Sequence, residues 1–376
     1  MALNSYRLGE LITQRREKKP ENEELPIRGV SKDGFIPPKQ IDADTDIYNV
    51  FYKKDFVYNP ARMELGSIAF NSDLDKGICS SLYEIFFVHR TDICLPEYLA
   101  LFVSQDEFAR YCNFLSSGSA REYCRFANIS QIKISLPSIE EQRKIVHDYK
   151  VVSDRIELLT KINEKSHLIC EAIYEEMCSI GEEKCLGDIV NEVESGGRPS
   201  GGAVNEGIPS IGAEKIERFG VYNFEKECYI PLDYFNNMKR GIVKSKDVLL
   251  YKDGAYTGKV SMAFDGFPYK QCAVNEHVFI LRTNSSKYQA FLYFVLNNHD
   301  VMTSIHNLAA SKAAQPGLNQ SELLGTKIIL PNESILNAFE IRANPFIKSI
   351  KNNAEEIKIL HEVKNNIILS ISKEVA

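Results

Sequence analysis

Three polar segments of the chain carry groups suited to binding phosphates and base edges. They span residues 195–202 (SGGRPSGG), 116–125 (SSGSAREYCR) and 310–315 (ASKAAQ). Small residues let backbone N–H groups approach phosphate oxygens, while Arg, Lys and Gln side chains hydrogen-bond base edges. The alternative interpretation is that these segments are solvated loops without a ligand, and the residues alone leave it open.

No motif in the sequence is typical of a catalytic or metal site. Residues 254–260 (GAYTGKV) resemble a phosphate-binding loop, but the spacing of the glycines is short by one residue and Val260 stands where Ser or Thr would hold Mg²⁺. Residues 59–62 (NPAR) match only part of an amino-methyltransferase motif. The cysteines and histidines show no zinc-ligand spacing. We therefore expect no catalytic residue, no metal and no cofactor.

The sequence repeats itself at a separation of 192 residues. Asp55 and Asp247, Gly66 and Gly258, Glu84 and Glu276, and Arg90 and Arg282 all correspond at that separation without a gap. Two copies with so long a period predict tandem globular domains rather than a solenoid. Each copy combines short β-like runs with one helical stretch, residues 97–115 and 286–305, so the predicted class of each domain is α+β.

A long helical pattern follows each copy. From Ser138 to about Ser179 the chain lacks Gly and Pro, and Ser138 with Glu141 predicts a capping-box start. In both patterns apolar residues recur every 3.5 residues on average, as in a coiled-coil seam. The predicted seam consists of Ile145, Tyr149, Val152, Ile156, Leu159, Ile173, Phe346, Ile350, Ile357, Leu360 and Ile367. Pro345 is expected to kink the second helix or delay its start. We expect the two helices to pair antiparallel, with the two domains at opposite ends.

Composition describes an ordinary soluble protein of two or three domains. Of 376 residues, 44% are hydrophobic and 26% charged. No apolar run approaches the ~20 residues needed to cross a bilayer, and no secretory signal opens the chain. We therefore expect a cytoplasmic protein without a membrane partner, whose nine cysteines are free thiols. The net charge of −6 mildly favours a protein ligand over a nucleic acid.

The chain resembles the specificity subunit of type I restriction-modification systems. The resemblance is carried in the first copy by residues 8–11 (LGEL), 55–62 (DFVYNPAR) and 66–69 (GSIA). In the second copy residues 186–189 (LGDI) carry it, and residues 139–145 (IEEQRKI) resemble the opening of the family's central helix.

The resemblance implies a non-catalytic protein with two DNA-recognition domains, each reading half of a bipartite target in double-stranded DNA. The predicted parts are a first recognition domain (1–138), a central helix (139–183), a second recognition domain (184–333) and a C-terminal helix (334–376). The resemblance also implies that the coiled coil binds methyltransferase subunits and, through them, a restriction subunit. Because the two recognition domains differ, we expect an asymmetric target. A tandem-domain adaptor that binds protein and lacks DNA specificity is the alternative.

Polarity and loop placement, rather than matched family positions, suggest the DNA contacts. In the first domain these are Arg28, Lys32, Lys39, Arg62, Arg121 and Arg125. In the second domain they are Arg198, Ser200, Lys215, Lys252, Tyr256, Lys259, Lys312 and Gln315.

Overall fold

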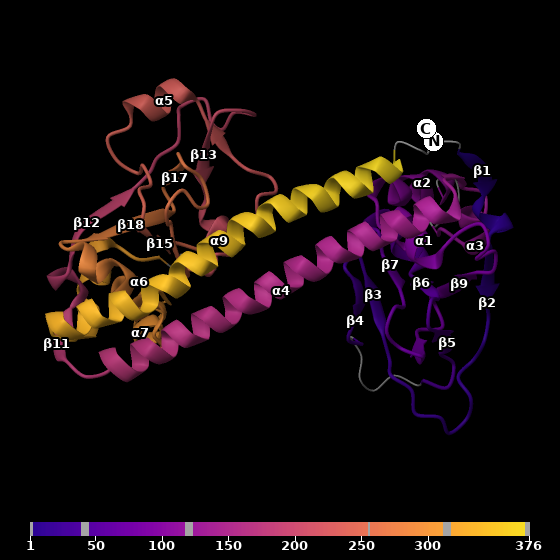
Figure 1. Ribbon diagram of the computed structural model, residues 1–376, viewed down its shortest axis with the longest axis horizontal. Helices are drawn as coiled ribbons and strands as arrows, with labels where there is room; N and C mark the ends of the chain where they lie inside the picture. Colours follow the sequence, from indigo (N-terminus) through magenta and orange to yellow (C-terminus); the bar gives the residue numbers. More distant parts are fainter. Residues whose placement is uncertain (1–2, 39–44, 117–122, 255, 311–316, 373–376) are drawn as a thin grey trace. The chain divides into compact units, whose positions relative to one another are not determined.

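The computed structural model describes residues 3–38, 45–116, 123–254, 256–310 and 317–372. The chain divides into two compact units, one formed by residues 1–154 with 361–376 and the other by residues 155–360. The division falls within two long helices, α4 (Ile139–Cys178) and α9 (Glu333–Ser372). Each unit therefore contains a globular domain together with parts of both long helices (Figure 1).

The first unit is built on an antiparallel sheet of four strands. In spatial order these are β2 (Ile12–Arg15), β9 (Glu84–Val88), β6 (Phe56–Tyr58) and β7 (Ile68–Phe70). Two-stranded pairs are β1 (Asn4–Arg7) with β10 (Lys133–Leu136), β3 (Gly29–Ser31) with β4 (Gly34–Ile36), and β5 (Asn49–Tyr52) with β8 (Lys76–Cys79). The helices are η1 (Leu8–Glu10), η2 (Pro60–Leu65), α1 (Pro96–Val103), α2 (Asp106–Ser116) and α3 (Phe126–Ile129). The rings of Phe56 and Phe86 stack in the core with centroids 4.8 Å apart.

The second unit repeats this plan. Its four-stranded sheet has the order β12 (Val190–Ser195), β18 (Val278–Thr283), β15 (Val248–Tyr251) and β16 (Val260–Met262). A second sheet has the order β14 (Tyr229–Ile230), β13 (Ile208–Ile211) and β17 (Ala273–Val274), while β11 (Glu182–Cys185) pairs with β19 (Lys327–Leu330). The shorter helices are η3 (Leu186–Asp188), η4 (Ala213–Lys215), α5 (Leu232–Asn237), η5 (Ser286–Tyr288), α6 (Gln289–Asn297), α7 (His299–Ala310) and α8 (Gln320–Leu324).

The sequence repeat has a direct counterpart in the backbone of the two domains. Strands β2, β9, β6 and β7 occupy the places of β12, β18, β15 and β16. Lys54 and Lys246, at matching positions, both adopt positive φ, at 69° and 71°. Such agreement at a rarely populated conformation shows that the two turns have the same geometry.

Each predicted helical stretch of the domains is divided in two. Residues 97–115 form α1 and α2, and residues 286–305 form η5, α6 and most of α7. Asn298 causes the second break because its backbone is extended, and its side-chain oxygen accepts from the backbone N–H of Asp300 at 3.1 Å. An amide side chain that caps the next helix in this way competes with helix continuation.

The long helices α4 and α9 pair antiparallel, as predicted. Within the second unit, the Asn353 amide donates to Asn163 Oδ1 at 2.8 Å, and Arg155 pairs with Glu356 at 2.7 Å. Rising residue numbers on α4 thus meet falling numbers on α9, and the two ribbons run in opposite directions in Figure 1. Within the first unit, the Lys364 ammonium lies 4.9 Å from the centroid of the Tyr149 ring.

The residues of the predicted seam face inward to different degrees. Leu159, Ile173 and Ile350 are buried. The half-buried members are Ile145, Tyr149, Val152, Ile156, Phe346, Ile357, Leu360 and Ile367. On α9 the buried residues also include Ala343, Ile347 and Ala354, which the predicted frame omits. This buried face is wider because α9 also packs against its own domain, where the rings of Phe339 and Phe294 lie 5.6 Å apart.

The expectation that Pro345 delays the start of the second helix is wrong. Helix α9 begins at Glu333 and continues through Pro345. Both Pro345 and Ile341, four residues earlier, are exposed. Because this face of α9 is exposed, water can replace the hydrogen bond that proline does not donate.

Candidate nucleic-acid interface

Three exposed cations of the first domain lie on segments that are tied to one another. Lys32 is in the turn between β3 and β4, Arg62 is in η2, and Arg125 precedes α3. The Ser67 hydroxyl, which directly follows the turn after η2, donates to the Val30 carbonyl of β3 at 3.1 Å. The backbone N–H of Cys124 donates to the Pro60 carbonyl of η2 at 2.9 Å. The structure therefore gathers Lys32, Arg62 and Arg125 around η2.

A half-buried carboxylate, that of Glu84, fixes the segment that carries Arg125. Glu84 Oε2 accepts from the Tyr58 hydroxyl at 2.8 Å and from the Phe126 N–H at 2.7 Å. Arg125 itself lies with its guanidinium carbon 5.9 Å from the ring centroid of the neighbouring Tyr123. The cation is thus presented from a constrained backbone, which reduces the entropy lost on binding a ligand.

The remaining predicted contacts of the first domain are less well placed or lie outside the description. Arg28 is half-buried, and its Nη1 donates to the adjacent Ile27 carbonyl at 3.0 Å. Lys39 and Arg121, like Lys312 and Gln315 of the second domain, lie outside the described residues.

In the second domain, Tyr256 and Lys259 border a hollow of about 400 Å³. Its other described lining residues are Gly254, Thr257, His306, Ala309 and Ala310. The Lys259 ammonium lies 4.7 Å from the Tyr256 ring centroid and also pairs with Glu217. Tyr256 is 62% exposed, so its ring presents a face on which a base could stack.

The hollow depends on a glycine at position 258. Gly258 has a φ of 100°, and an added Cβ would lie 2.7 Å from the His306 ring. Any other residue there would be strained and would displace His306. In the sequence this glycine stands out as the repeat counterpart of Gly66 and as part of an incomplete phosphate-loop motif, and neither signal indicates the hollow.

The other predicted contacts of the second domain differ in their availability. Arg198 and Ser200 are exposed, although Arg198 pairs with Glu276 at 2.7 Å. Lys252 is half-buried, and its ammonium lies 5.1 Å from the Phe279 ring centroid.

The prediction that Lys215 contacts DNA is wrong. Lys215 is 8% exposed, and its ammonium pairs with the Glu227 carboxylate at 2.9 Å and donates to the Asn223 carbonyl at 2.8 Å. The ammonium therefore holds a loop in place and is not presented to solvent.

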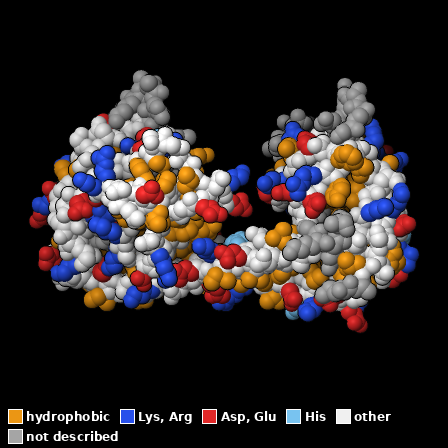
Figure 2. Space-filling model, turned by 90° about the horizontal axis from the view of Figure 1, so that it is seen from above, with side chains coloured by type: hydrophobic (Ala, Val, Ile, Leu, Met, Phe, Trp, Pro, Cys, Tyr) orange, Lys and Arg blue, Asp and Glu red, His pale blue; other side chains and the backbone are white. Residues whose placement is uncertain are grey.

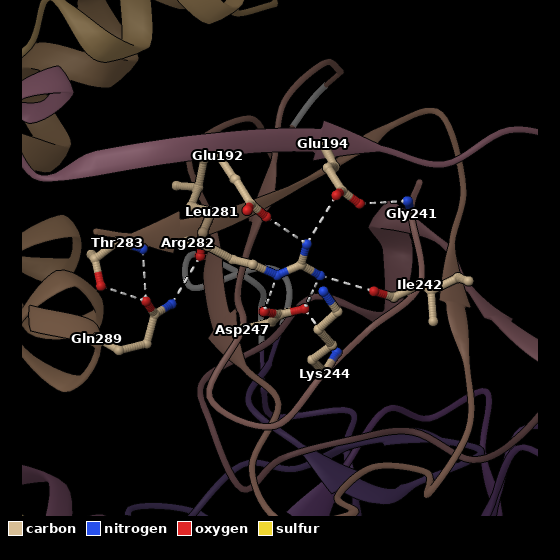
Figure 3. Close-up of polar contacts among 10 residues, drawn as sticks. All are labelled: Glu192, Glu194, Gly241, Ile242, Lys244, Asp247, Leu281, Arg282, Thr283 and Gln289. Atoms are coloured by element: carbon tan, nitrogen blue, oxygen red, sulfur yellow. Dashed lines mark hydrogen bonds and ion pairs between the residues drawn. The ribbon is translucent and has the colours of Figure 1, made fainter. Parts of the chain in front are cut away.

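A buried ionic network under the second domain's surface was not recognised from the sequence. Figure 3 shows the Arg282 guanidinium enclosed by carboxylates. Its Nε and Nη2 each contact an Asp247 oxygen at 2.7 Å, and its Nη1 lies 2.9 Å from Glu194 Oε1. Nη2 also donates to the Ile242 carbonyl at 2.9 Å, while Glu194 Oε2 accepts from the Gly241 N–H at 2.8 Å. The network thereby fixes the backbone at residues 241–242.

Burial raises the pKa of the Asp247 carboxyl, while its hydrogen bonds with Arg282 and with the Lys244 backbone act in the opposite direction. Burial and pairing therefore have opposite effects on the Asp247 pKa, and removing Arg282 would leave burial opposed by the Lys244 contacts alone.

The first domain has a matching clamp in which the arginine comes from a different strand. Asp55, the counterpart of Asp247, is bound by Arg15 of β2 through contacts of 2.7 and 3.1 Å. Arg90, the counterpart of Arg282, instead pairs with Asp92 at the surface. The repeated aspartate was the signal available in the sequence, but the exchange of strands concealed its partner.

The described residues contain no cluster of three or more potential metal ligands. Three of the buried thiols are weakly reactive, since burial raises the pKa of Cys94, Cys170 and Cys272 to about 12 in each case. Among the helices of the described chain, none is both long and apolar enough to cross a bilayer.

Comparison with known proteins shows which proteins this chain resembles. Residues 4–165 match the family model described as "Type I restriction modification DNA specificity domain". The specificity subunit of the type I restriction enzyme MjaIX from Methanocaldococcus jannaschii is 23% identical over 307 residues, which are 74% of this chain and 68% of that protein. The HindI specificity subunit from Haemophilus influenzae is 27% identical over 125 residues, which are 32% of this chain and 27% of the relative.

The fold of the whole chain agrees with these matches. The crystal structure of the type I S subunit from M. genitalium superposes with a TM-score of 0.62 at 14% identity, covering 98% of this chain and 96% of that one. The family model and these relatives agree with the predicted resemblance to type I restriction-modification specificity subunits, and the M. genitalium subunit shares the fold of the whole chain. The matched model is described as a DNA specificity domain, and both relatives are named as specificity subunits.

Proposed function

We propose that this chain reads a bipartite, asymmetric DNA target, with one half-site for each domain. The observation that carries the proposal is the duplicated domain: residues 4–165 match a DNA specificity domain, and the second unit has the same strand order. Phosphate contacts would supply affinity and base contacts specificity. Because the target is cellular DNA, the proposal places the protein in the cytoplasm.

Differences between the two candidate surfaces support an asymmetric target. The first domain offers Lys32, Arg62 and Arg125 around a short 3-10 helix. The second offers Tyr256 and Lys259 beside a hollow lined by glycine and histidine. Side chains of different shape and hydrogen-bonding capacity read different base edges.

The charge distribution is compatible with the proposal in spite of the net charge of −6. On the face drawn in Figure 2, Lys and Arg side chains alternate with Asp and Glu rather than forming one continuous basic surface. Local groups of cations, and not the overall field, would therefore have to supply the phosphate contacts.

We further propose that α4 and α9 bind the methyltransferase subunits and, through them, the restriction subunit. Leu158, Ile162 and Ile169 form a stripe on α4 and are 50%, 38% and 42% exposed. The spacing of four and seven residues places them on one helix face, away from the seam residue Leu159. Neighbouring exposed apolar residues mark protein interaction surfaces.

The double variant Leu158→Asp/Ile162→Asp is expected to lose co-purification with the methyltransferase subunit, with recovery falling roughly tenfold. Both side chains are exposed, so the folded chain should tolerate the charges. Pull-down from co-expressing cells measures the effect. Thr160→Asp, on another face of the same helix, is the matched control. Equal recovery with all variants would show that the stripe on α4 does not contact the methyltransferase subunit.

The decisive test of the proposed function is methylation. The chain would be co-expressed with its methyltransferase subunit, and methylated adenines would then be mapped by single-molecule sequencing of the host DNA. A split, asymmetric motif with a fixed central gap is the expected result. A palindromic motif would contradict asymmetry. Association without new methylation, together with passage of the chain through a polyanion column, would favour the protein-adaptor alternative.

A further inference from the structure

A second hollow of the second domain lies where two glycines of the polar segment 195–202 meet residues that the sequence did not single out. It has a volume of about 320 Å³ and is lined by Gly196, Gly197, Tyr234, Asn237, Met238, Lys239 and Arg240. Residues 234–240 form the end of α5 and the segment that follows it. Figure 1 shows α5 beside β13 and β17, separated from α6.

The charged groups that line this hollow are both cationic. Lys239 and Arg240 are exposed, and neither forms an ion pair with a described carboxylate. This distinguishes them from Arg198, Lys246 and Lys259, whose charges are matched by Glu276, Glu340 and Glu217. Two unmatched cations beside one hollow produce a local positive potential.

The surrounding backbone brings the two cations and the glycine turn together. At Gly241, which has a φ of 78°, an added Cβ would lie 2.5 Å from the Gly196 Cα. The residue after Arg240 is thus in close contact with the first glycine of the turn. This approach requires glycine, because any side chain would force the segments apart.

The buried network of Arg282 holds this arrangement in place. Glu194 accepts from the Gly241 N–H, and Arg282 donates to the next carbonyl, that of Ile242. Glu192, Glu194 and Asp247 all direct carboxylate oxygens at the Arg282 guanidinium, which offsets one of their three negative charges (Figure 3). None of these three carboxylates forms an ion pair with Lys239 or Arg240, so the charged groups of both side chains remain available to a ligand.

We propose that this hollow binds a backbone phosphate of DNA, with Lys239 and Arg240 as the contacting side chains. The inference rests on the proposed function and names an anchoring site for the half-site read by the second domain. At the separation of 192 residues, the first domain has Ile47 and Tyr48 at these positions and so lacks both cations. The anchor is accordingly specific to the second domain.

The test compares the salt dependence of DNA binding by the full chain carrying Lys239→Gln/Arg240→Gln. Affinity for a duplex containing the mapped target would be measured by fluorescence anisotropy across a range of salt concentrations. Losing two phosphate contacts should reduce the slope of log K against log[salt] by about 2 and weaken binding roughly 10- to 100-fold near physiological salt. Discrimination against an unrelated duplex should change little, because phosphate contacts carry no sequence information.

The matched control is Lys226→Gln/Lys287→Gln, which removes two exposed cations of the same domain from outside the hollow. Its slope should stay close to that of the unaltered chain. An unchanged slope in Lys239→Gln/Arg240→Gln, or an equal decrease in the control, would overturn the phosphate site while leaving the proposed function intact. Failure of the unaltered chain to prefer its mapped target would instead reject the proposed function, and the inference with it.

Discussion

Arg282→Ala is expected to lower the free energy of unfolding of the second unit by about 3–5 kcal/mol, which is the typical cost of removing one partner from a buried ion pair. The substitution would leave Asp247, only 3% exposed at its side chain, without its two guanidinium contacts. It would also free the Ile242 carbonyl from its donor and Glu194 from its cation. Arg282→Lys should recover little, because one ammonium cannot replace a planar group that contacts several acceptors.

Hydrogen exchange is the appropriate measurement, since the chain has two compact units and need not unfold in one step. Amides of β15 and β18, which flank the network, should lose protection in Arg282→Ala, whereas β6 and β9 of the first unit should not. Arg90→Ala is the matched control, because Arg90 occupies the equivalent repeat position but pairs with Asp92 at the surface. Equal protection in Arg282→Ala and Arg90→Ala would show that the network contributes no net stability.

The effect of Arg282→Ala should also depend on pH. Burial already raises the pKa of Asp247, and removing the guanidinium should raise that pKa further. A carboxyl that can protonate escapes the cost of a buried, unpaired charge. The difference in stability between Arg282→Ala and the unaltered chain is therefore expected to narrow as the pH falls.

The large-scale organisation could be predicted because repetition and apolar periodicity can both be read from the order of residues without knowledge of the tertiary contacts. A constant separation of 192 residues implied two similar domains, and the apolar period of 3.5 residues identified the pairing face of α4. The frame on α9 was less accurate, because Ala343 and Ile347 also pack into the core of the second domain, which α9 follows. Such tertiary packing widens a buried face beyond what a heptad alone indicates.

The candidate site was predicted less well, because exposure and pairing of a charge depend on distant residues. Lys215 and Lys239 look alike in the sequence, yet one is enclosed by Glu227 and the other lines a hollow. Likewise, the partner of Asp55 could not be inferred from that of Asp247, because the arginine comes from β2 in one domain and from β18 in the other. Strand pairing, which brings these residues together, is not a local property of the chain.

The stability of the second unit is expected to fall as the pH decreases from about 6.5 towards 4, because His167 of α4 is buried as a neutral ring. Its Nε2 lies 2.7 Å from the Phe219 carbonyl, to which the neutral Nε2–H tautomer donates. Burial lowers the pKa of His167 to about 4; the hydrogen bond to Phe219 opposes this shift, and nearby Arg218 adds to it. Nδ1 is buried without a hydrogen-bond partner among the described residues, so a second ring proton would have no acceptor.

The sign of the effect follows from which state binds the proton. Between pH 6.5 and 4 the unfolded chain protonates His167 while the folded chain does not, so protons favour unfolding. The stability of the folded state with a neutral His167 is therefore unreduced above about pH 6.5 and decreases progressively below it. A shift of this size corresponds to about 3 kcal/mol in total.

His167→Gln provides the test because glutamine can still donate to the Phe219 carbonyl but does not titrate in this range. The difference in stability between His167→Gln and the unaltered chain should change by about 3 kcal/mol between pH 7 and 4, with other titrating groups cancelling in the comparison. Hydrogen exchange of residues 213–224 would report it locally. His147→Gln, at an exposed position of the same helix, should leave the pH dependence unchanged. Parallel pH profiles for His167→Gln and the unaltered chain would show that protonation of His167 does not cause the loss of stability at low pH.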